Sequence, residues 1–251
     1  MAETTEKKTK AAGGIDGLKA WVKKTTDRLQ LNKEHPAVSA WIACGLGAVF
    51  MLGATLAVRS PGWRDLGLFL CLLAFYHMWE WTYVALFHPR ELSGNSFLIN
   101  HSVEWVCAWA FAFAEYALEH ALWPGMKSRW CVMLPALAVA AAGQALRTVS
   151  MFQAGSNFAH IIEEDARADH RLVTTGVYAV SRHPSYLGWF WWTVGMAALL
   201  GNPLSAVAFP AAAWYFFHDR IAYEERTLVA IFGDQYVEYR KRVPVRIPFI
   251  N

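Results

Sequence analysis

The chain has 251 residues, of which 55% are hydrophobic and 17% are charged, and its formal net charge at pH 7 is +3. The charged fraction is low for a soluble domain, and the small net charge gives no reason to expect nucleic acid as a partner. Apolar residues gather in long blocks, several of which reach the roughly 20 residues needed to cross a bilayer. The four cysteines lie inside these blocks and none has metal-binding spacing, so we expect neither a disulfide nor a metal site. The composition excludes an ordinary soluble domain and indicates an all-α, polytopic integral membrane protein.

Residues 1–34 form a polar tail ahead of the first apolar block. The tail mixes Lys, Glu, Thr and Gly, a composition typical of disorder, although residues 16–31 suit a short interfacial helix. Because this polar, Lys-rich run precedes any apolar stretch, we do not expect it to be a cleavable signal. We expect a boundary at residue 34, followed by one integral membrane domain over 35–251.

Six apolar blocks follow in that domain, and we expect each to form a transmembrane helix. The predicted spans are residues 37–58, 66–87, 101–123, 130–150, 185–200 and 203–220. The tight turn GNP joins the last two as a helical hairpin. The fifth block is short, so we expect it either to tilt little or to stop before the far interface.

Lys and Arg residues are concentrated near the two ends of the chain. The first 34 residues contain eight of them, and the C-terminal YRKRVPVR segment is also basic. Loops rich in Lys and Arg stay in the cytosol, and an even number of spans returns the chain to the side on which it began. We therefore expect both termini in the cytosol, together with the connection between the fourth and fifth spans.

That connection, residues 151–184, is polar and unusually long for a link between helices. It ends in RHPSYLGWFWW, where Pro184 suits the first position of a helix. The first-turn amides, those of Ser185, Tyr186 and Leu187, would then be free to bind an anionic group. Arg182 and His183 flank these amides. An interfacial anchor, with Arg and aromatic side chains at the lipid headgroups, is the alternative interpretation of this motif.

Several ionisable side chains lie inside or at the ends of the predicted spans. They include His77, Glu80, Glu104, Glu115, Glu119, Arg147, Arg220 and Glu224. Such groups are costly in a membrane and are functional hypotheses by default, but pairing between helices is the simpler interpretation, which we prefer for Glu104 and Glu115. Arg147 and Arg220 differ, because both lie where a span meets the cytosol. Two guanidinium groups there suit a carboxylate or phosphate.

Five segments carry a resemblance to a known family. They read NHSVEW, MFQAGSNFAHII, HRLVTTGVY, GVYAVSRHPSYLGWF and EERTLVAIFGDQYVEYRKRVP. Together they resemble the isoprenylcysteine carboxyl methyltransferases, over roughly residues 37–250. The RHPxYxG motif followed by a Glu pair marks a wider group that includes phospholipid methyltransferases and sterol reductases, whereas AGSNFAH together with RHPSYLGWFWW is much more specific. Members of the family can have eight spans, so six spans correspond to its shorter form.

The resemblance implies transfer of a methyl group from S-adenosylmethionine to the C-terminal α-carboxylate of prenylated cysteine in processed CaaX proteins, such as Ras- and Rho-type small GTPases. It implies the endoplasmic reticulum membrane, S-adenosylhomocysteine as product, and cofactor binding by segments 151–186 and 217–250. Arg220 would bind the substrate and act in catalysis, with Arg147 as its helper. The implied cofactor contacts are Glu163, His170, Arg171, Leu172, Val173, Tyr178, His183, Pro184, Ser185, Tyr186 and Glu224.

The acceptor chemistry separates this function from its alternatives. A C-terminal carboxyl has a pKa of about 3.3–3.7 in water, so it is ionised at neutral pH and needs no general base. The enzyme has only to align two reactants and exclude water. Phospholipid N-methylation would use the same cofactor site, but an amine acceptor calls for a base or acidic residues rather than two arginines. A sterol reductase would need a nicotinamide cofactor, and a non-catalytic scaffold would not need a long polar loop with clustered His and Arg.

Overall fold

The computed structural model describes residues 35–99, 103–167 and 170–251, and every regular element in these ranges is a helix. The α-helices are α2 (Pro36–Arg59), α3 (Arg64–Phe87), α4 (Val103–Leu122), α5 (Trp130–Ala154), α6 (Pro184–Leu199), α7 (Pro203–Phe232) and α8 (Asp234–Arg242). The connections contain 3-10 helices, η1 (Pro61–Trp63), η2 (Pro89–Glu91), η3 (Gly94–Phe97), η4 (Pro124–Met126), η5 (Gly155–Asn157) and η6 (Gly176–Ala179). The predicted all-α fold is confirmed. The N-terminal tail and the helix expected at 16–31 lie outside the described residues.

The six predicted apolar blocks coincide with α2 to α7. Like α2 at Pro36, both α6 and α7 begin at a proline, Pro184 and Pro203, where the fixed φ of the ring suits the first helical position. The expected hairpin joins them, with Gly201 at a φ of +61° in the turn. α7 runs on to Phe232, about three turns past the predicted end of its span, and stops before Gly233, whose φ is also positive.

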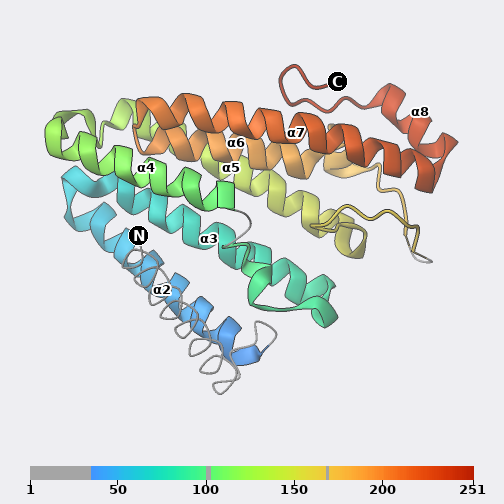
Figure 1. The fold of residues 1–251 in the computed structure, drawn as a ribbon, viewed down its shortest axis with the longest axis horizontal. Coiled ribbons are helices and arrows are strands. Elements are labelled where there is room, and N and C mark those ends of the chain that lie inside the picture. The colour runs from blue at the N-terminus through green and yellow to red at the C-terminus, as the bar shows by residue number, and fades with distance from the viewer. Residues whose placement is uncertain (1–34, 100–102, 168–169) are drawn as a thin grey trace, which may run out of the picture.

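Helices α3 to α7 lie alongside one another as a bundle, with α2 on the outer side of α3 (Figure 1). α6 is central, because it packs against α5 on one side and α7 on the other. The largest core cluster draws buried side chains from all five helices, among them Phe69, Tyr116, Met133, Trp192 and Phe209. The polar 155–183 connection and α8 lie at the same end of this bundle (Figure 1).

Glycines allow the backbones of α5 and α6 to meet closely. A Cβ atom on Gly143 would lie 2.4 Å from the backbone N of Trp192, and one on Gly188 would lie 2.6 Å from the backbone N of Arg147. Small residues at such crossings are a common way to pack helices in membranes, where van der Waals contact replaces the hydrophobic effect. The close approach brings Arg147 of α5 beside the first turn of α6.

Two of the described helices qualify as membrane spans by length and hydropathy together: α2, and the stretch from Trp130 to Asn157 that contains α5. α6 has 16 residues, which makes it about 24 Å long at 1.5 Å per residue, short of the roughly 30 Å of a hydrocarbon core. α7 has 30 residues, which is about 45 Å and more than one bilayer core requires. The count of six spans therefore stays a prediction.

Two segments without regular helices are held against the end of the bundle. The hydroxyl oxygen of Tyr83 in α3 lies 2.6 and 2.7 Å from the carbonyl oxygens of Gly155 and Phe158, which share its single O–H donor and hold the start of the 155–183 connection against α3. The C-terminal residues 243–251 return along α7, where the indole N–H of Trp214 donates to the carbonyl of Pro248 at 2.7 Å. The Ser181 hydroxyl donates to the carbonyl of Val245 at 2.7 Å. The C-terminal segment thus supports the turn that leads into α6.

Candidate active site

Two cavities adjoin at the end of the bundle where α5, α6 and α7 meet the 155–183 connection. Phe158, Ala159 and Tyr186 line both of them. One cavity is polar and lies around the start of α6, and the other is largely aromatic and runs between the helices. Tyr186 therefore lies at the boundary between the two cavities.

The polar cavity gathers residues from three separate parts of the chain. Ten of the eleven residues predicted to contact a cofactor line it: His170, Arg171, Leu172, Val173, Tyr178, His183, Pro184, Ser185, Tyr186 and Glu224. Glu163 is the exception. Its carboxylate pairs with Arg167 at 2.6 Å and lies 3.7 Å from the imidazole of His170, so it stands behind a residue of the wall.

The first turn of α6 presents two of the three backbone amides that the sequence suggested. Leu187 donates its N–H to the carbonyl of His183 at 3.0 Å, so the prediction that this amide is free is wrong. The reason is that His183 is the N-cap residue, and its carbonyl already accepts the first bond of the helix. The amides of Ser185 and Tyr186 precede that bond and have no acceptor within the helix.

Paired charges behind the first turn of α6 fix its orientation. Arg182 is buried, forms an ion pair with Glu225 and donates to the carbonyl of Val243 at 3.0 Å. His183 lies 3.3 Å from the same carboxylate and 3.9 Å from that of Glu224. Burial raises the pKa of Glu225, but hydrogen bonds from His183 and Arg182 outweigh it and lower the pKa to about 2. The charge of Arg182 is therefore paired with Glu225 and does not serve a ligand in the cavity.

Two other polar atoms of this cavity have no hydrogen-bond partner among the described residues. The Oε2 atom of Glu224 and the Nδ1 atom of His170 are buried and make no hydrogen bond within that part of the chain. Such atoms are costly unless something satisfies them. Burial raises the pKa of Tyr178, so its phenol stays protonated at neutral pH. A ligand with an amine or hydroxyl donor for Glu224 and a polar group for His170 would fit this wall.

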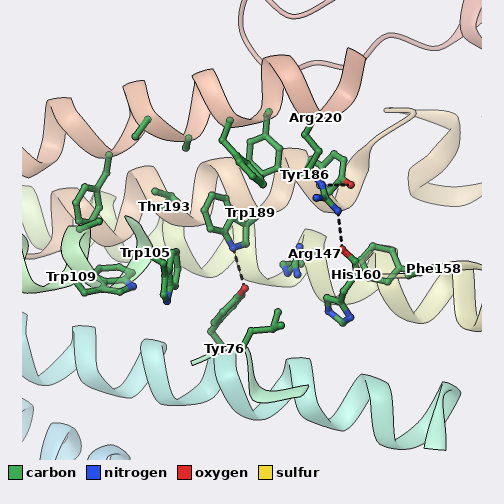
Figure 2. Close-up of a pocket in the computed structure, with 18 residues that line it drawn as sticks. Tyr76, Trp105, Trp109, Arg147, Phe158, His160, Tyr186, Trp189, Thr193 and Arg220 are labelled. Atoms are coloured by element: carbon green, nitrogen blue, oxygen red, sulfur yellow. Dashed lines mark hydrogen bonds between the residues drawn. The ribbon is translucent and has the colours of Figure 1, made fainter. Parts of the chain in front are cut away.

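The aromatic cavity has a volume of about 230 Å³ and an apolar body with a cationic end. Trp105, Trp109, Trp189, Phe209, Phe216 and Phe217 line its body. Figure 2 shows Arg147, His160, Tyr186 and Arg220 gathered at one end, with Trp105 and Trp109 toward the other. The indole N–H of Trp189 donates to the hydroxyl of Tyr76 at 3.0 Å, whereas Nε1 of Trp109 and Oγ1 of Thr193 are buried without a hydrogen-bond partner among the described residues. This shape fits a long apolar group that ends in an anion.

The two arginines at the cationic end differ in their partners. Arg220 donates from Nε to the hydroxyl of Tyr186 and from Nη2 to the carbonyl of His160, both at 2.8 Å. No carboxylate of the described residues forms an ion pair with it, so its charge is uncompensated in that part of the chain. Arg147 instead donates two hydrogen bonds to the buried carboxylate of Glu80. Arg220 is thus the better receiver for an anion.

Comparisons with known proteins agree on one family. The model of the isoprenylcysteine carboxyl methyltransferase (ICMT) family matches residues 136–230, which supply most of the polar cavity. A protein-S-isoprenylcysteine O-methyltransferase of Homo sapiens is 41% identical over 209 residues, covering 83% of this chain and 74% of that protein. One of Dictyostelium discoideum is 40% identical over 239 residues, covering 94% and 95%. The chain belongs to the isoprenylcysteine carboxyl methyltransferase family.

A solved structure extends the agreement to the fold of this family. The structure of a eukaryotic intramembrane Ras methyltransferase, an isoprenylcysteine carboxyl methyltransferase, superposes with a TM-score of 0.84 at 34% identity. The match covers 94% of this chain and 86% of that one. The resemblance seen in the sequence is confirmed, and the chain is a membrane methyltransferase of this family.

Family motifs identified most of the polar wall, but the structure adds residues that the sequence reasoning did not place in the site. Glu225 lies next to Glu224 in the EE pair and holds both Arg182 and His183. His160 bonds to Arg220 through its carbonyl and to Glu80 through its imidazole. The only sequence signal for Glu80 was its charge within a predicted span, and nothing in the sequence indicated its partner.

Proposed function

We propose that this family member transfers the methyl group of S-adenosylmethionine to the C-terminal carboxylate of prenylated cysteine in processed CaaX proteins. The observation that carries the proposal is the shared boundary of the two cavities. Tyr186 separates a polar cavity with unpaired donors and acceptors from an aromatic cavity that ends at Arg220. A methyl donor on one side and a carboxylate on the other would meet there.

The polar cavity suits the donor's charged and hydroxylated parts. When bound, S-adenosylmethionine supplies an electrophilic methyl group on a sulfonium. The carboxylate of Glu224 suits its amine or hydroxyl groups, and the amides of Ser185 and Tyr186 suit its carboxylate. Among the aromatic rings nearby, that of Tyr178 offers an uncharged face to a cation. Glu163 joins this set through His170 rather than by lining the cavity.

The aromatic cavity suits the acceptor. Its Trp and Phe walls take the prenyl chain, and the charge of Arg220 orients the carboxylate. Since the carboxylate is ionised at neutral pH, no base is required of the protein. Methyl transfer is accelerated by the alignment of the two reactants and by the apolar wall, which excludes water. Arg147 lies at the same end, where its charge is matched by Glu80.

The cationic end argues against a phospholipid amine as the acceptor. Arg147 and Arg220 line it, and the imidazole of His160 is engaged by Glu80 at 2.7 Å. Among the described residues at this end, a primary amine that must lose a proton would find no free base, and as an ammonium it would be repelled by Arg220. The same end attracts a carboxylate.

The location of the enzyme is part of the proposal. We place it in the endoplasmic reticulum membrane with six spans, both termini in the cytosol, and Ras- and Rho-type GTPases among its substrates. The basic termini and the polar 155–183 connection support a cytosolic position for the cofactor cavity. The extra turns of α7 support it too, because they carry Glu224 beyond the predicted span at residue 220.

The proposal is tested by the chemistry of the methylated product. The purified protein in vesicles that contain phosphatidylethanolamine is given methyl-labelled S-adenosylmethionine and N-acetyl-farnesylcysteine. A methyl ester releases labelled methanol in base, whereas an N-methyl group does not. We expect base-labile label on the prenylcysteine. Base-stable label on the phospholipid would overturn the proposal in favour of N-methylation.

A further inference from the structure

A buried carboxylate that the mechanism above does not use lies at the cationic end of the aromatic cavity. Glu80 of α3 is 1% exposed. Both of its oxygens accept hydrogen bonds from Arg147: Oε1 from Nε, and Oε2 from Nη2 at a distance of 2.9 Å. Oε2 also lies 2.7 Å from Nε2 of His160. Three segments of the chain, α3, α5 and the 155–183 connection, are thus tied together at one carboxylate.

We propose that Glu80 is a positioning residue that keeps Arg147 neutralised, so that Arg220 alone presents an uncompensated positive charge to the acceptor carboxylate. The inference rests on the proposed function, because it concerns how that acceptor is held. It assigns different roles to two arginines that the sequence placed together. Arg220 orients the substrate, and Arg147 is a structural link between helices.

The donors of Arg147 support this division. Its Nε and Nη2 groups face Glu80, and Nη1 donates to the hydroxyl of Ser185 at 3.0 Å. Ser185 lies in the first turn of α6, which lines the cofactor cavity. Arg147 therefore connects Glu80 to the cofactor side. By contrast, Arg220 donates its hydrogen bonds to a hydroxyl and a carbonyl, neither of which cancels its charge.

The reaction itself explains why a second free cation would be harmful. An anionic carboxylate becomes a neutral ester as its oxygen bonds to the methyl carbon, while the carbon–sulfur bond breaks and the electron pair returns to sulfur. A nearby positive charge therefore stabilises the reactant carboxylate more than it stabilises the transition state, because the negative charge of the carboxylate is already smaller there. Binding energy of this kind tightens the ground state without raising turnover. One arginine orients the carboxylate, and a second uncompensated arginine would slow methyl transfer.

His160 makes the arrangement cooperative. Its imidazole contacts Glu80, and its carbonyl accepts the bond from Arg220. A change at Glu80 would therefore move the loop residue that also orients Arg220. His160 thus links the Glu80–Arg147 pair to Arg220, and Figure 2 shows the bond between its carbonyl and Arg220.

A double-mutant cycle tests the inference, with Glu80→Gln, Arg147→Gln and the double variant assayed on N-acetyl-farnesylcysteine. Turnover is divided by the concentration of sites that bind S-adenosylmethionine, which removes unfolded protein from the comparison. Glu80→Gln frees Arg147, so kcat should fall about tenfold or more while KM does not rise. Arg147→Gln leaves a buried anion beside the acceptor, so KM should rise. The double variant should return both constants toward the wild-type values.

A matched control breaks a partly buried ion pair elsewhere. Glu119 and Lys127 form a pair at 2.6 Å that lines neither cavity, so Glu119→Gln should reduce only the amount of folded protein. If Glu80→Gln does not fold, the double variant decides, because it should fold and keep a near-normal KM. Wild-type constants in Glu80→Gln, a raised KM in that variant, or a double variant no better than the worse single variant would overturn the inference. If the wild type itself does not methylate the prenylcysteine, the proposed function fails and the inference fails with it.

Discussion

Arg220 and Tyr186 are joined by a hydrogen bond of 2.8 Å from the guanidinium Nε to the phenolic oxygen. Arg220 belongs to α7 and lines the aromatic cavity, whereas Tyr186 belongs to the first turn of α6 and lines both cavities. The guanidinium also lies over the phenol ring, with Cζ 5.4 Å from its centroid. Among the described residues, Arg220 is the one cation of the aromatic cavity without an ion pair. The bond to Tyr186 holds it at the boundary with the polar cavity.

Replacing Arg220 with Lys tests the geometry of that cation. Lys keeps the charge but lacks the planar fork that bonds to Tyr186 and to the carbonyl of His160 while facing a carboxylate. Arg220→Lys should fold and bind S-adenosylmethionine normally, and kcat/KM for the prenylcysteine should fall about tenfold or more. Steady-state kinetics and a cofactor titration measure the two effects. Arg226→Lys, at an exposed residue of the same helix, is the control, and equal activity in both variants would exclude the assigned role.

Glu224→Gln tests the donor side. The Oε2 atom of Glu224 is buried without a hydrogen-bond partner among the described residues, so a ligand amine or hydroxyl can take it. Loss of a charged hydrogen bond should weaken S-adenosylmethionine binding about ten- to a hundredfold. Titration calorimetry on the detergent-solubilised protein measures the dissociation constant. Glu238→Gln, at an exposed pair with Lys241 on α8, should leave the constant unchanged; an unchanged constant in Glu224→Gln as well would refute the contact.

The backbone contact between α5 and α6 predicts the effect of one added methyl group. A Cβ on Gly143 would lie 2.4 Å from the backbone N of Trp192, so Gly143→Ala must push the helices apart at a cost of about 1–3 kcal/mol. Arg147, one turn along α5, would then separate from Ser185. We expect a lower thermal midpoint and lost methyl transfer. Gly45→Ala, where nothing lies within 4 Å, should change neither, and a fully active Gly143→Ala protein would contradict the close packing.

The charges behind the first turn of α6 predict a dependence on acid. The pKa of Glu225 is lowered from 4.5 to about 2 in the folded protein, because the hydrogen bonds from His183 and Arg182 outweigh burial. A depressed carboxyl pKa contributes stability that is complete above the unfolded pKa and is lost as pH falls toward the folded one. Thermal midpoints should therefore decline between about pH 4.5 and pH 2. The decline should be shallower in Glu225→Gln, and identical slopes would exclude this pair as its source.

Much of the fold could be predicted from local patterns. Apolar block length predicted α2 to α7, and the prolines at 184 and 203 fixed where α6 and α7 begin. The end of α7 was harder to predict, because hydropathy marks where a span leaves lipid but not where the helix stops. The prediction that the Leu187 amide is free was wrong for a similar reason. Pro184 marks the first helical residue, but the carbonyl of the residue before it, His183, already accepts the N–H of Leu187.

The site could be predicted only where a motif carried it. Ten residues of the polar wall came from family motifs, although they lie in segments far apart in sequence. The pairing of Glu80 with Arg147 joins residues 67 positions apart, and no spacing rule relates two different helices across such a distance. For the same reason, position at the end of a span did not separate Arg147 from Arg220, although the resemblance implied that Arg220 binds the substrate and Arg147 helps it. Only the packing of α3 against α5 shows that one of them is already neutralised.

The most direct test of the account compares acceptors that differ at one end only. N-acetyl-farnesylcysteine carries both the carboxylate and the prenyl chain, its C-terminal amide lacks the anion, and N-acetyl-S-methylcysteine lacks the chain. Methyl transfer from labelled S-adenosylmethionine is measured for each at equal concentration in vesicles. The two-cavity arrangement predicts rapid, base-labile methylation of the first compound and little or none of the other two. Equal methylation with and without the prenyl chain, or methylation of the amide as fast as that of the acid, would contradict it.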